Sequence, residues 1–432
     1  MEIVTLRKIM SFPRRLALLP LFFCPAAVFA QQSYTWQELR DKFKSTNPTL
    51  QAGAIGISEA KAQEITAYLR PNPDITATLD QINPFTNNPC AGGNIDCYRP
   101  LGQALPFISG TYLHERGHKR ELRRESAQKA TAIAISQQAD LQRTLLFNLR
   151  AAFINTLQAK AVVALAKESL ASYDKVLDVS RDRFKAGDIA QVDLDRLELA
   201  RVQFESDVET SSVSLRTAKI QLLQLLNERT PIEQFDVTGP FDFTGQILPN
   251  DEFRRIALDS RPDLKAAAQA VDKAQTDHRL AMANGTTDPT FGMDFARNPP
   301  IPVYMGLSVT IPIKIFDRNQ GEKLRTQLDI GKTERTRDAN YALVFSDVDS
   351  AYATLMSNLN LLRPYKAEHL QRAVRVRDTI SFSYQHGGAA LLDFLNAEND
   401  YRSIQRTYLS LIGSYLTAAA QLNLAVGNEV IQ

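Results

Sequence analysis

The stretch Phe184-Lys-Ala-Gly187-Asp-Ile-Ala-Gln-Val-Asp193 returns later in the chain as Tyr384-Gln-His-Gly387-Gly-Ala-Ala-Leu-Leu-Asp393. The offset is 200 residues, from position 184 to 384, and it also pairs Leu222 with Leu422. A large internal repeat determines the architecture, because each copy folds as one unit and packs against the other. The repeated unit here is a helical hairpin that turns at a glycine, which indicates a scaffold rather than a catalyst.

Helical periodicity dominates on both sides of these turns. Apolar residues recur every three or four positions, as in Leu170, Tyr173 and Leu177, which is typical of a helix packed along a seam. The pattern predicts three helices in each half of the chain, over residues 34–70, 117–183 and 190–227 and again over 250–284, 318–383 and 390–426. The long helices would reach about 100 Å and the short ones about 55 Å. Pro364 predicts a kink or bulge in the second long helix.

Two strands are predicted between the short and the long helix of each half, near 74–82 and 103–114 and near 288–297 and 303–313. In the last of them apolar residues alternate with small polar ones, and the apolar set is Val303, Met305, Leu307, Val309 and Ile311. This alternation is typical of a membrane β-barrel strand; a small soluble sheet that caps a helical bundle is the alternative. Four strands cannot close a barrel, and open edges are costly in lipid, so spanning strands would require an oligomer.

The chain is therefore predicted to be mainly α with a small membrane β part, built from duplicated long helical hairpins. We divide it into a signal peptide (1–30), a first repeat (31–227), an inter-repeat linker (228–249) and a second repeat (250–432).

The N-terminal residues have the features of a secretory signal. Arg14 and Arg15 precede the apolar run Leu16–Phe23, small residues before Gln31 suit cleavage, and Met10 is an alternative start. Removal of residues 1–30 changes the net charge from +2 to −1, since four basic residues and one acidic residue are lost. A near-neutral chain argues against a nucleic-acid partner. No other apolar run is long enough for a transmembrane helix, so strands would have to make any membrane span.

Cys90 and Cys97 are the cysteines that remain after the signal. A close pair of cysteines in an exported protein usually forms a disulfide. We predict this disulfide within an enlarged loop over 83–100, where it would contribute about 2–3 kcal/mol.

In the order of its elements and in its motifs, the mature chain resembles the TolC-like outer-membrane efflux family. The most specific stretch is Gly306-Leu-Ser-Val-Thr-Ile-Pro-Ile-Lys-Ile-Phe-Asp-Arg-Asn-Gln-Gly321, which looks like the strand-to-helix junction of the branch that serves cation and multidrug pumps of the resistance–nodulation–division type. The Arg261-Pro-Asp-Leu264 start of the second repeat and the stretch Leu392–Glu398 also fit.

The resemblance implies a homotrimer in the outer membrane. Three chains would form a twelve-stranded β-barrel, four strands from each, continued by an α-barrel tunnel through the periplasm. It also implies a periplasmic adaptor and an inner-membrane transporter as partners, outer-membrane lipid around the barrel, and no cofactor. The function implied is the passive exit duct of a tripartite efflux pump for small solutes or metal cations. An exit duct for type I secretion is the alternative.

The same resemblance implies a gate at the periplasmic end of the tunnel. Tyr384 and Asp393 stand at the positions of the family's gate tyrosine and first gate aspartate, and Asp193 stands at the partner aspartate of the first repeat. Ala389 replaces a tethering arginine and Asn396 a second aspartate, so the charged latch is thinner here. Three Asp393 carboxylates around one axis would attract cations. The alternative is that both aspartates only stabilise helix N-termini.

The hairpin tips are predicted to serve the turns and to offer contacts to an adaptor. Their residues are Gly187, Gly387, Gly388 and Phe184. The turn is the first role of the glycines, because glycine tolerates the left-handed backbone that such turns need.

One motif suggests an enzyme. His114-Glu115-Arg116-Gly117-His118 matches the His-Glu-x-x-His pattern of zinc proteases, which requires both histidines on one helical face. Gly117 lies inside the motif, and the motif falls at a strand-to-helix junction where the family commonly has a second glycine in place of His118. We therefore predict no catalytic residues and no metal site, with a zinc metalloprotease as a remote alternative.

Overall fold

The computed structural model describes residues 32–82, 88–89, 96–97, 101, 104–243, 245–298 and 301–431. The predicted signal peptide and Cys90 lie outside these residues, so the signal peptide and the Cys90–Cys97 disulfide remain predictions. Two short strands lie within the predicted loop over 83–100, β3 (Asn88–Pro89) and β4 (Asp96–Cys97), and they pair in antiparallel fashion.

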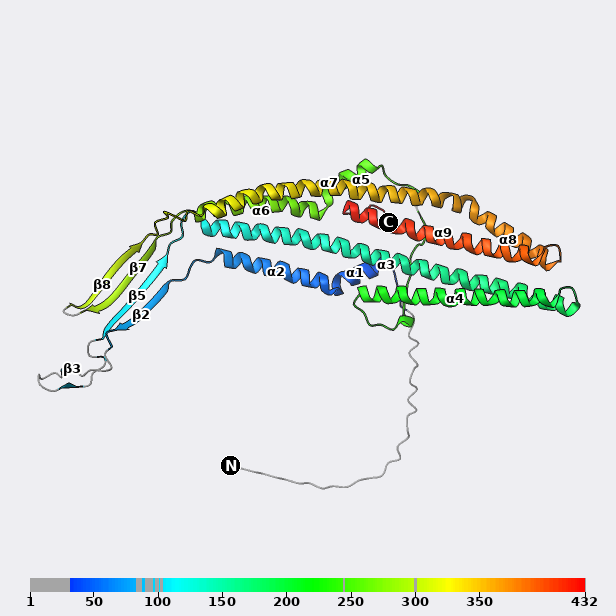
Figure 1. Cartoon of the computed structure of the whole chain (residues 1–432), viewed down its shortest axis with the longest axis horizontal. Coiled ribbons are helices and arrows are strands. Elements are labelled where there is room, and N and C mark those ends of the chain that lie inside the picture. Colours follow the sequence, from blue (N-terminus) through cyan, green and yellow to red (C-terminus); the bar gives the residue numbers. More distant parts are fainter. Residues whose placement is uncertain are drawn as a thin grey trace, which may run out of the picture.

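The helices form one elongated column, with the strands at one end and the hairpin turns at the other (Figure 1). The first repeat contributes α1 (Trp36–Thr46), α2 (Pro48–Tyr68), α3 (Lys119–Ala186) and α4 (Gln191–Leu225). The second contributes α5 (Asn250–Ser260), α6 (Pro262–Asn284), α7 (Gln320–Pro364), α8 (Leu370–Gln385) and α9 (Leu391–Val426). The helix α3 runs through the middle of the column and packs against α2, α4, α6 and α9, so it contacts both repeats.

Two of the predicted short helices, those over 34–70 and 250–284, are each in fact two helices that meet at the residue before a proline. Asn47 and Arg261 both have an extended backbone, with ψ of 119° and 121°. The proline ring disfavours the helical conformation in the residue before it, whereas proline itself is favourable as the first residue of α2 and of α6. The prediction of one continuous helix over 34–70 and over 250–284 is therefore wrong at these two positions.

The predicted irregularity at Pro364 is confirmed. The helix α7 ends at this proline, and the next turn, Tyr365–His369, is a π-helix that leads into α8. Proline has no N–H to donate and its ring crowds the preceding turn, so the chain widens locally. Figure 1 shows that the long helix bends in this region.

The four predicted long strands are confirmed, and they form one antiparallel sheet in the order β2-β5-β7-β8. Their bounds are β2 (Asp74–Asp80), β5 (Leu105–Leu113), β7 (Thr290–Asn298) and β8 (Ile301–Thr310). The central pairing, between β5 and β7, joins the first repeat to the second. In this sheet β2 and β8 are the outer strands, so each leaves one edge unpaired within the described chain.

One face of this sheet is apolar and exposed. The register aligns Ile108, Phe295 and Met305 in one row, and paired residues of antiparallel strands point to the same face. Leu307, on the same face, is 77% exposed. The row on the opposite face is small and polar, and consists of Thr76, Ser109, Asp294 and Gly306. The sheet extends beyond the helical column in Figure 1, so none of the described helices covers its apolar face within a single chain.

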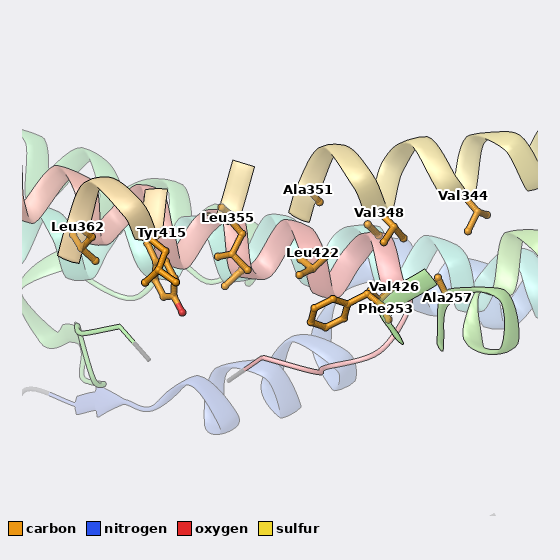
Figure 2. Packing of buried hydrophobic residues seen from close by; sticks show 14 of the residues in the cluster. Phe253, Ala257, Val344, Val348, Ala351, Leu355, Leu362, Tyr415, Leu422 and Val426 are labelled. Carbon is orange, nitrogen blue, oxygen red and sulfur yellow. The ribbon is translucent and has the colours of Figure 1, made fainter. Parts of the chain in front are cut away.

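The helices are joined by apolar clusters along the column. Figure 2 shows the largest, in which Phe253 of α5, Leu355 of α7 and Leu422 of α9 lie together and are fully buried. Leu222, the first-repeat counterpart of Leu422, is buried in a separate cluster with Phe153. The duplicated leucines therefore have the same structural role in both repeats.

A small parallel ribbon between the start of the first repeat and the linker was not predicted. The strand β1 (Gln32–Tyr34) pairs with β6 (Phe235–Val237), which follows a 3₁₀ turn over Ile232–Gln234. Phe235 and Val237 are buried in the cluster of the first repeat. A three-residue strand is too short to show an alternating pattern.

Two helices, α3 and α9, each contain a stretch long and apolar enough to cross a membrane by composition. The prediction that no such run exists in the mature chain is therefore wrong. Of these stretches, 39% in α3 and 56% in α9 is already buried inside the chain. Both helices pack along the column, so contacts between helices account for their apolar composition.

The strand-to-helix junction does not form the helix that a zinc protease needs. The strand β5 ends at Leu113 and α3 begins at Lys119, so both histidines of the motif precede the helix. Gly117 and His118 have left-handed backbones, with φ of +71° and +56°. No group of three or more His, Cys, Asp or Glu side chains among the described residues is arranged to hold a metal. The helical geometry that the zinc metalloprotease alternative requires is therefore not found at His114 and His118.

Candidate gate at the hairpin tips

Both hairpins turn through a glycine in the left-handed conformation. Gly187 has φ of +86° and Gly387 has φ of +78°. The amide of Gly187 donates to the carbonyl of Phe184 at 3.0 Å, and the amide of Gly388 donates to that of Ser383 at 2.7 Å. The three glycines are exposed, whereas Phe184 is half-buried against the core behind the tips. The tips are therefore compact turns with their glycines on the surface.

Four aromatic rings join the two hairpins just behind the tips. The ring centroids of Tyr173 and Phe204 lie 4.3 Å apart, and those of Tyr384 and Phe394 lie 5.1 Å apart. Tyr173 and Phe394 connect the two pairs at 6.0 Å. The first pair belongs to the first repeat and the second pair to the second. Stacked pairs of this kind contribute about 0.5–1.5 kcal/mol each beyond their burial, so the rings hold the hairpins together.

Tyr384 is a core residue of the single chain. It is only 4% exposed, and its hydroxyl is buried without a hydrogen-bond partner among the described residues. Arg183, at the end of α3, donates to the backbone carbonyl of Tyr384 at 2.7 Å and lies over its ring at 5.7 Å. Sequence reasoning missed Arg183, because basic residues are common in the last turn of any helix.

A second connection between the hairpins is ionic, and sequence reasoning missed it as well. Asp207 of α4 lies 2.9 Å from Arg402 and 2.7 Å from Arg406, both on α9. The guanidinium of Arg402 also lies 3.9 Å from the centre of the Phe204 ring. Burial lowers the pKa of Arg402, although the nearby Asp207 carboxylate opposes this shift. No local pattern marks Asp207, because its partners lie 195 residues or more further along the chain.

Next to this ion pair, Glu398 is buried at 2% exposure. Burial raises its pKa, while the charges of Arg377 and Arg402 act in the opposite direction. Its repeat counterpart, Glu198, is instead half-exposed and pairs with Arg181 at 3.1 Å. The repeat therefore preserves the residue type here but not its environment.

The predicted acidic residues lie outside this core. Asp193 and Asp393 are each the third residue of a helix, α4 and α9 respectively. Asp193 is half-exposed, 3.8 Å from Arg196, whereas Asp393 and Asn396 are exposed. A carboxylate in the first turn of a helix is stabilised by the helix dipole. The positions of Asp193 and Asp393 therefore fit the alternative interpretation, in which both aspartates stabilise helix N-termini. The structure does not bring these groups into contact with the ring of Tyr384, which is buried.

The tips thus contain two layers with different properties. Inside the chain, stacked rings, Arg183 and the Asp207–Arg402 pair hold one hairpin against the other. On the surface, the exposed carboxylate of Asp393 and exposed apolar side chains such as Val192 and Leu392 are available to other molecules. A movement of one hairpin along the other would have to break the inner layer.

Comparisons with known proteins agree with this architecture. Residues 254–428 match the family described as outer membrane efflux protein. The chain is 22% identical over 384 residues to the cobalt-zinc-cadmium resistance protein CzcC of Cupriavidus metallidurans, over 88% of this chain and 87% of that protein. It is 22% identical over 324 residues to the outer membrane protein TolC of Escherichia coli, over 69% of this chain and 64% of that protein. The solved structure of CusC superposes with a TM-score of 0.74, at 16% identity, over 97% of this chain and 99% of CusC.

Proposed function

We propose that the chain is a member of the outer membrane efflux protein family, and that three copies of it form the exit duct of a tripartite pump that expels divalent metal cations. The protein resides in the outer membrane, and its helical column lies in the periplasm. The duct is passive, and its energy comes from the partner in the inner membrane.

The observation that carries the trimer is the open sheet. An unpaired strand edge costs several kcal/mol per group in lipid, so the edges of β2 and β8 require partners from other copies. Three copies of four strands supply twelve, which is enough to close a barrel, whereas four are not. Closure would place the apolar face on the outside against lipid and the small polar face on the lumen.

The helical column supports a tunnel that is continuous with this barrel. The helix α3 has 68 residues, which corresponds to about 100 Å at the usual rise per residue. It begins six residues after β5 ends, so only a short connection would separate the barrel from the tunnel. Exposed apolar residues along α4 and α7, including Leu199, Val202, Leu324 and Leu328, would be covered by neighbouring copies.

The tips would meet the periplasmic adaptor. Gly187, Gly387 and Gly388 are exposed at the end of the column farthest from the sheet, with the half-buried Phe184 beneath them. An adaptor between this end and an inner-membrane transporter would complete the tripartite pump. Binding there would bias the gate directly, since the stacked rings and ion pairs lie just behind the tips.

The gate and the substrate class are proposed together. Asp393 is exposed in the first turn of α9, and three copies around one axis would present three carboxylates to the lumen. Tyr384 would act from within, by packing the second hairpin against the first. CzcC is named for resistance to cobalt, zinc and cadmium, and an acidic constriction suits such cations.

Two substitutions at neighbouring positions of one strand test whether the sheet forms part of a membrane barrel. Ala77 and Thr78 of β2 are both exposed but point to opposite faces. Lysine at Ala77 would face lipid at a cost of roughly 2–4 kcal/mol near mid-membrane, whereas lysine at Thr78 would face the lumen. We expect the Ala77→Lys variant, and not Thr78→Lys, to lose the trimeric species extracted from outer membranes in mild detergent. Equal recovery of trimers from the two variants, or a soluble monomer of the unmodified protein, would refute the barrel.

The substrate class is tested separately in a host strain that lacks this chain but keeps its pump. We expect greater sensitivity to zinc, cobalt and cadmium, reversed by the wild-type chain. Unchanged metal sensitivity with increased retention of an organic dye would overturn the cation proposal and leave the duct intact.

A further inference from the structure

A cavity of about 430 Å³ lies at the junction between β5 and α3. Its lining combines the basic and imidazole side chains of the former protease motif with neighbouring arginines: Arg70, His114, Arg116, His118 and Arg120. Tyr112, Glu115, Lys119 and Glu121 complete most of the wall. Neither the duct nor the gate uses these residues.

The charges of this cavity are not balanced. Glu115 is held by Arg123 from outside the cavity, and Lys119 is paired with Asp288 at 2.6 Å. Glu121 pairs with Arg120 at 3.0 Å. Arg70 and Arg116 are exposed, and neither forms an ion pair with another residue in the described ranges. Two guanidinium groups therefore remain for a ligand, and such groups suit the oxygens of a phosphate.

The position of the cavity indicates which class of phosphate-containing molecule would bind there. Tyr112 pairs with Phe291 on the apolar face of the sheet, and the ring of His114 lies 6.4 Å from that of Phe291. The cavity therefore opens where the apolar face ends and the helices begin. Next to it, Arg120 and Arg124 lie over the ring of Tyr68 at 4.3 and 4.7 Å. Basic and aromatic side chains that border an apolar band are typical of the level of lipid headgroups.

We propose that this cavity binds the phosphate of a phospholipid in the periplasmic leaflet, with the acyl chains of the lipid along the apolar face of β5 and β7. Arg70 and Arg116 contact the phosphate oxygens, and His114 and His118 donate further hydrogen bonds. The inference rests on the proposed function, because it requires the sheet to lie in a membrane. The histidines are thus headgroup contacts, and the arginines beside them would disfavour a metal cation.

The test uses native mass spectrometry of the purified full-length protein in mild detergent. The probes are palmitoyl-oleoyl phosphatidylglycerol, the corresponding diacylglycerol without phosphate, and inorganic phosphate alone. The test variant is Arg70→Gln with Arg116→Gln. The matched control is Arg229→Gln with Arg335→Gln, which removes two exposed arginines that also lack ion pairs among the described residues and lie away from the sheet.

We expect the wild-type protein and the control to retain phosphatidylglycerol and the test variant to bind it at least about tenfold more weakly, since two charge-assisted contacts are lost. The diacylglycerol is expected to give no adduct. Equal retention by both double variants would overturn the inference. Tight binding of inorganic phosphate alone would also overturn it, because the cavity would then be a general anion site. Dissociation of the test variant into monomers with unchanged lipid retention would likewise overturn the inference, because the two arginines would then serve contacts between copies.

The same spectrum separates this inference from the proposed function. A trimer without a lipid adduct leaves the duct in place and removes the lipid site. The absence of any trimer removes the duct, whatever the lipid does.

Discussion

Removal of the charge on Asp207 is expected to open the hairpin tips. Asp207 belongs to the first hairpin, and its partners Arg402 and Arg406 belong to the second. The substitution Asp207→Asn keeps the size of the side chain and removes only its charge. If the hairpins must separate during opening, this pair is lost in the open state and kept in the closed one.

The magnitude follows from burial. The side chains of Asp207 and Arg402 are 15% and 12% exposed, so the substitution leaves a largely buried guanidinium without its counter-ion. Loss of one partner from a buried pair costs about 3–5 kcal/mol. Arg406 is 44% exposed, and Arg402 keeps its contact with the Phe204 ring, so we expect a smaller cost of about 2–3 kcal/mol per chain. A bias of 2 kcal/mol shifts a two-state equilibrium roughly thirtyfold.

The assay is single-channel recording in planar bilayers, together with thermal unfolding of the same preparations. We expect Asp207→Asn to raise the mean conductance and to lower the melting temperature. Glu198→Gln is the matched control, because its pair with Arg181 is half-exposed, lies within one hairpin and contributes at most about 1 kcal/mol. A lower melting temperature with unchanged conductance would refute the reasoning, since the pair would then hold the fold and not the gate.

Three further predictions concern the hairpin tips. Tyr384→Phe removes a hydroxyl that has no hydrogen-bond partner among the described residues, so chemical denaturation should show a change below about 1 kcal/mol; a larger loss would mean that the hydroxyl is bonded. Asp393→Asn is expected to lower the preference for cations, and an unchanged reversal potential in a salt gradient would contradict this. Gly187→Ala should cost about 1–2 kcal/mol of stability from backbone strain alone, because the space around it is open; equal stability would exclude the left-handed turn.

A fifth prediction concerns pH and the start of the second repeat. Burial alone would raise the pKa of Asp263, but the hydrogen bonds and charge of Arg261 outweigh it and hold that pKa below its usual value. A lowered pKa in the folded state means that the stabilisation is present above the unfolded value, about 3.9, and is lost as the pH falls through the folded value. Asp263→Asn should therefore lower the melting temperature at pH 7, with a much smaller difference from wild type near pH 2. An equal difference at both pH values would show that charge is not the cause.

The sequence predicted the elements well because their patterns are local. Helical spacing located α3, α4 and α9 within a few residues, and alternation located the four strands of the sheet. The breaks before Pro48 and Pro262 were missed, although the rule that explains them is also local. The exposed apolar face follows from alternation as well, since neighbouring residues of a strand must point to opposite sides.

The sequence by itself thus determined the duplicated hairpins, the left-handed turns at Gly187 and Gly387, and the two-faced strands. Only the tertiary structure decided that β5 pairs with β7, that Tyr384 is buried while Asp393 is exposed, and that Asp207 meets Arg402. Periodicity is set by bonded geometry within a few residues of chain, whereas burial and ion pairing depend on which distant helices come into contact.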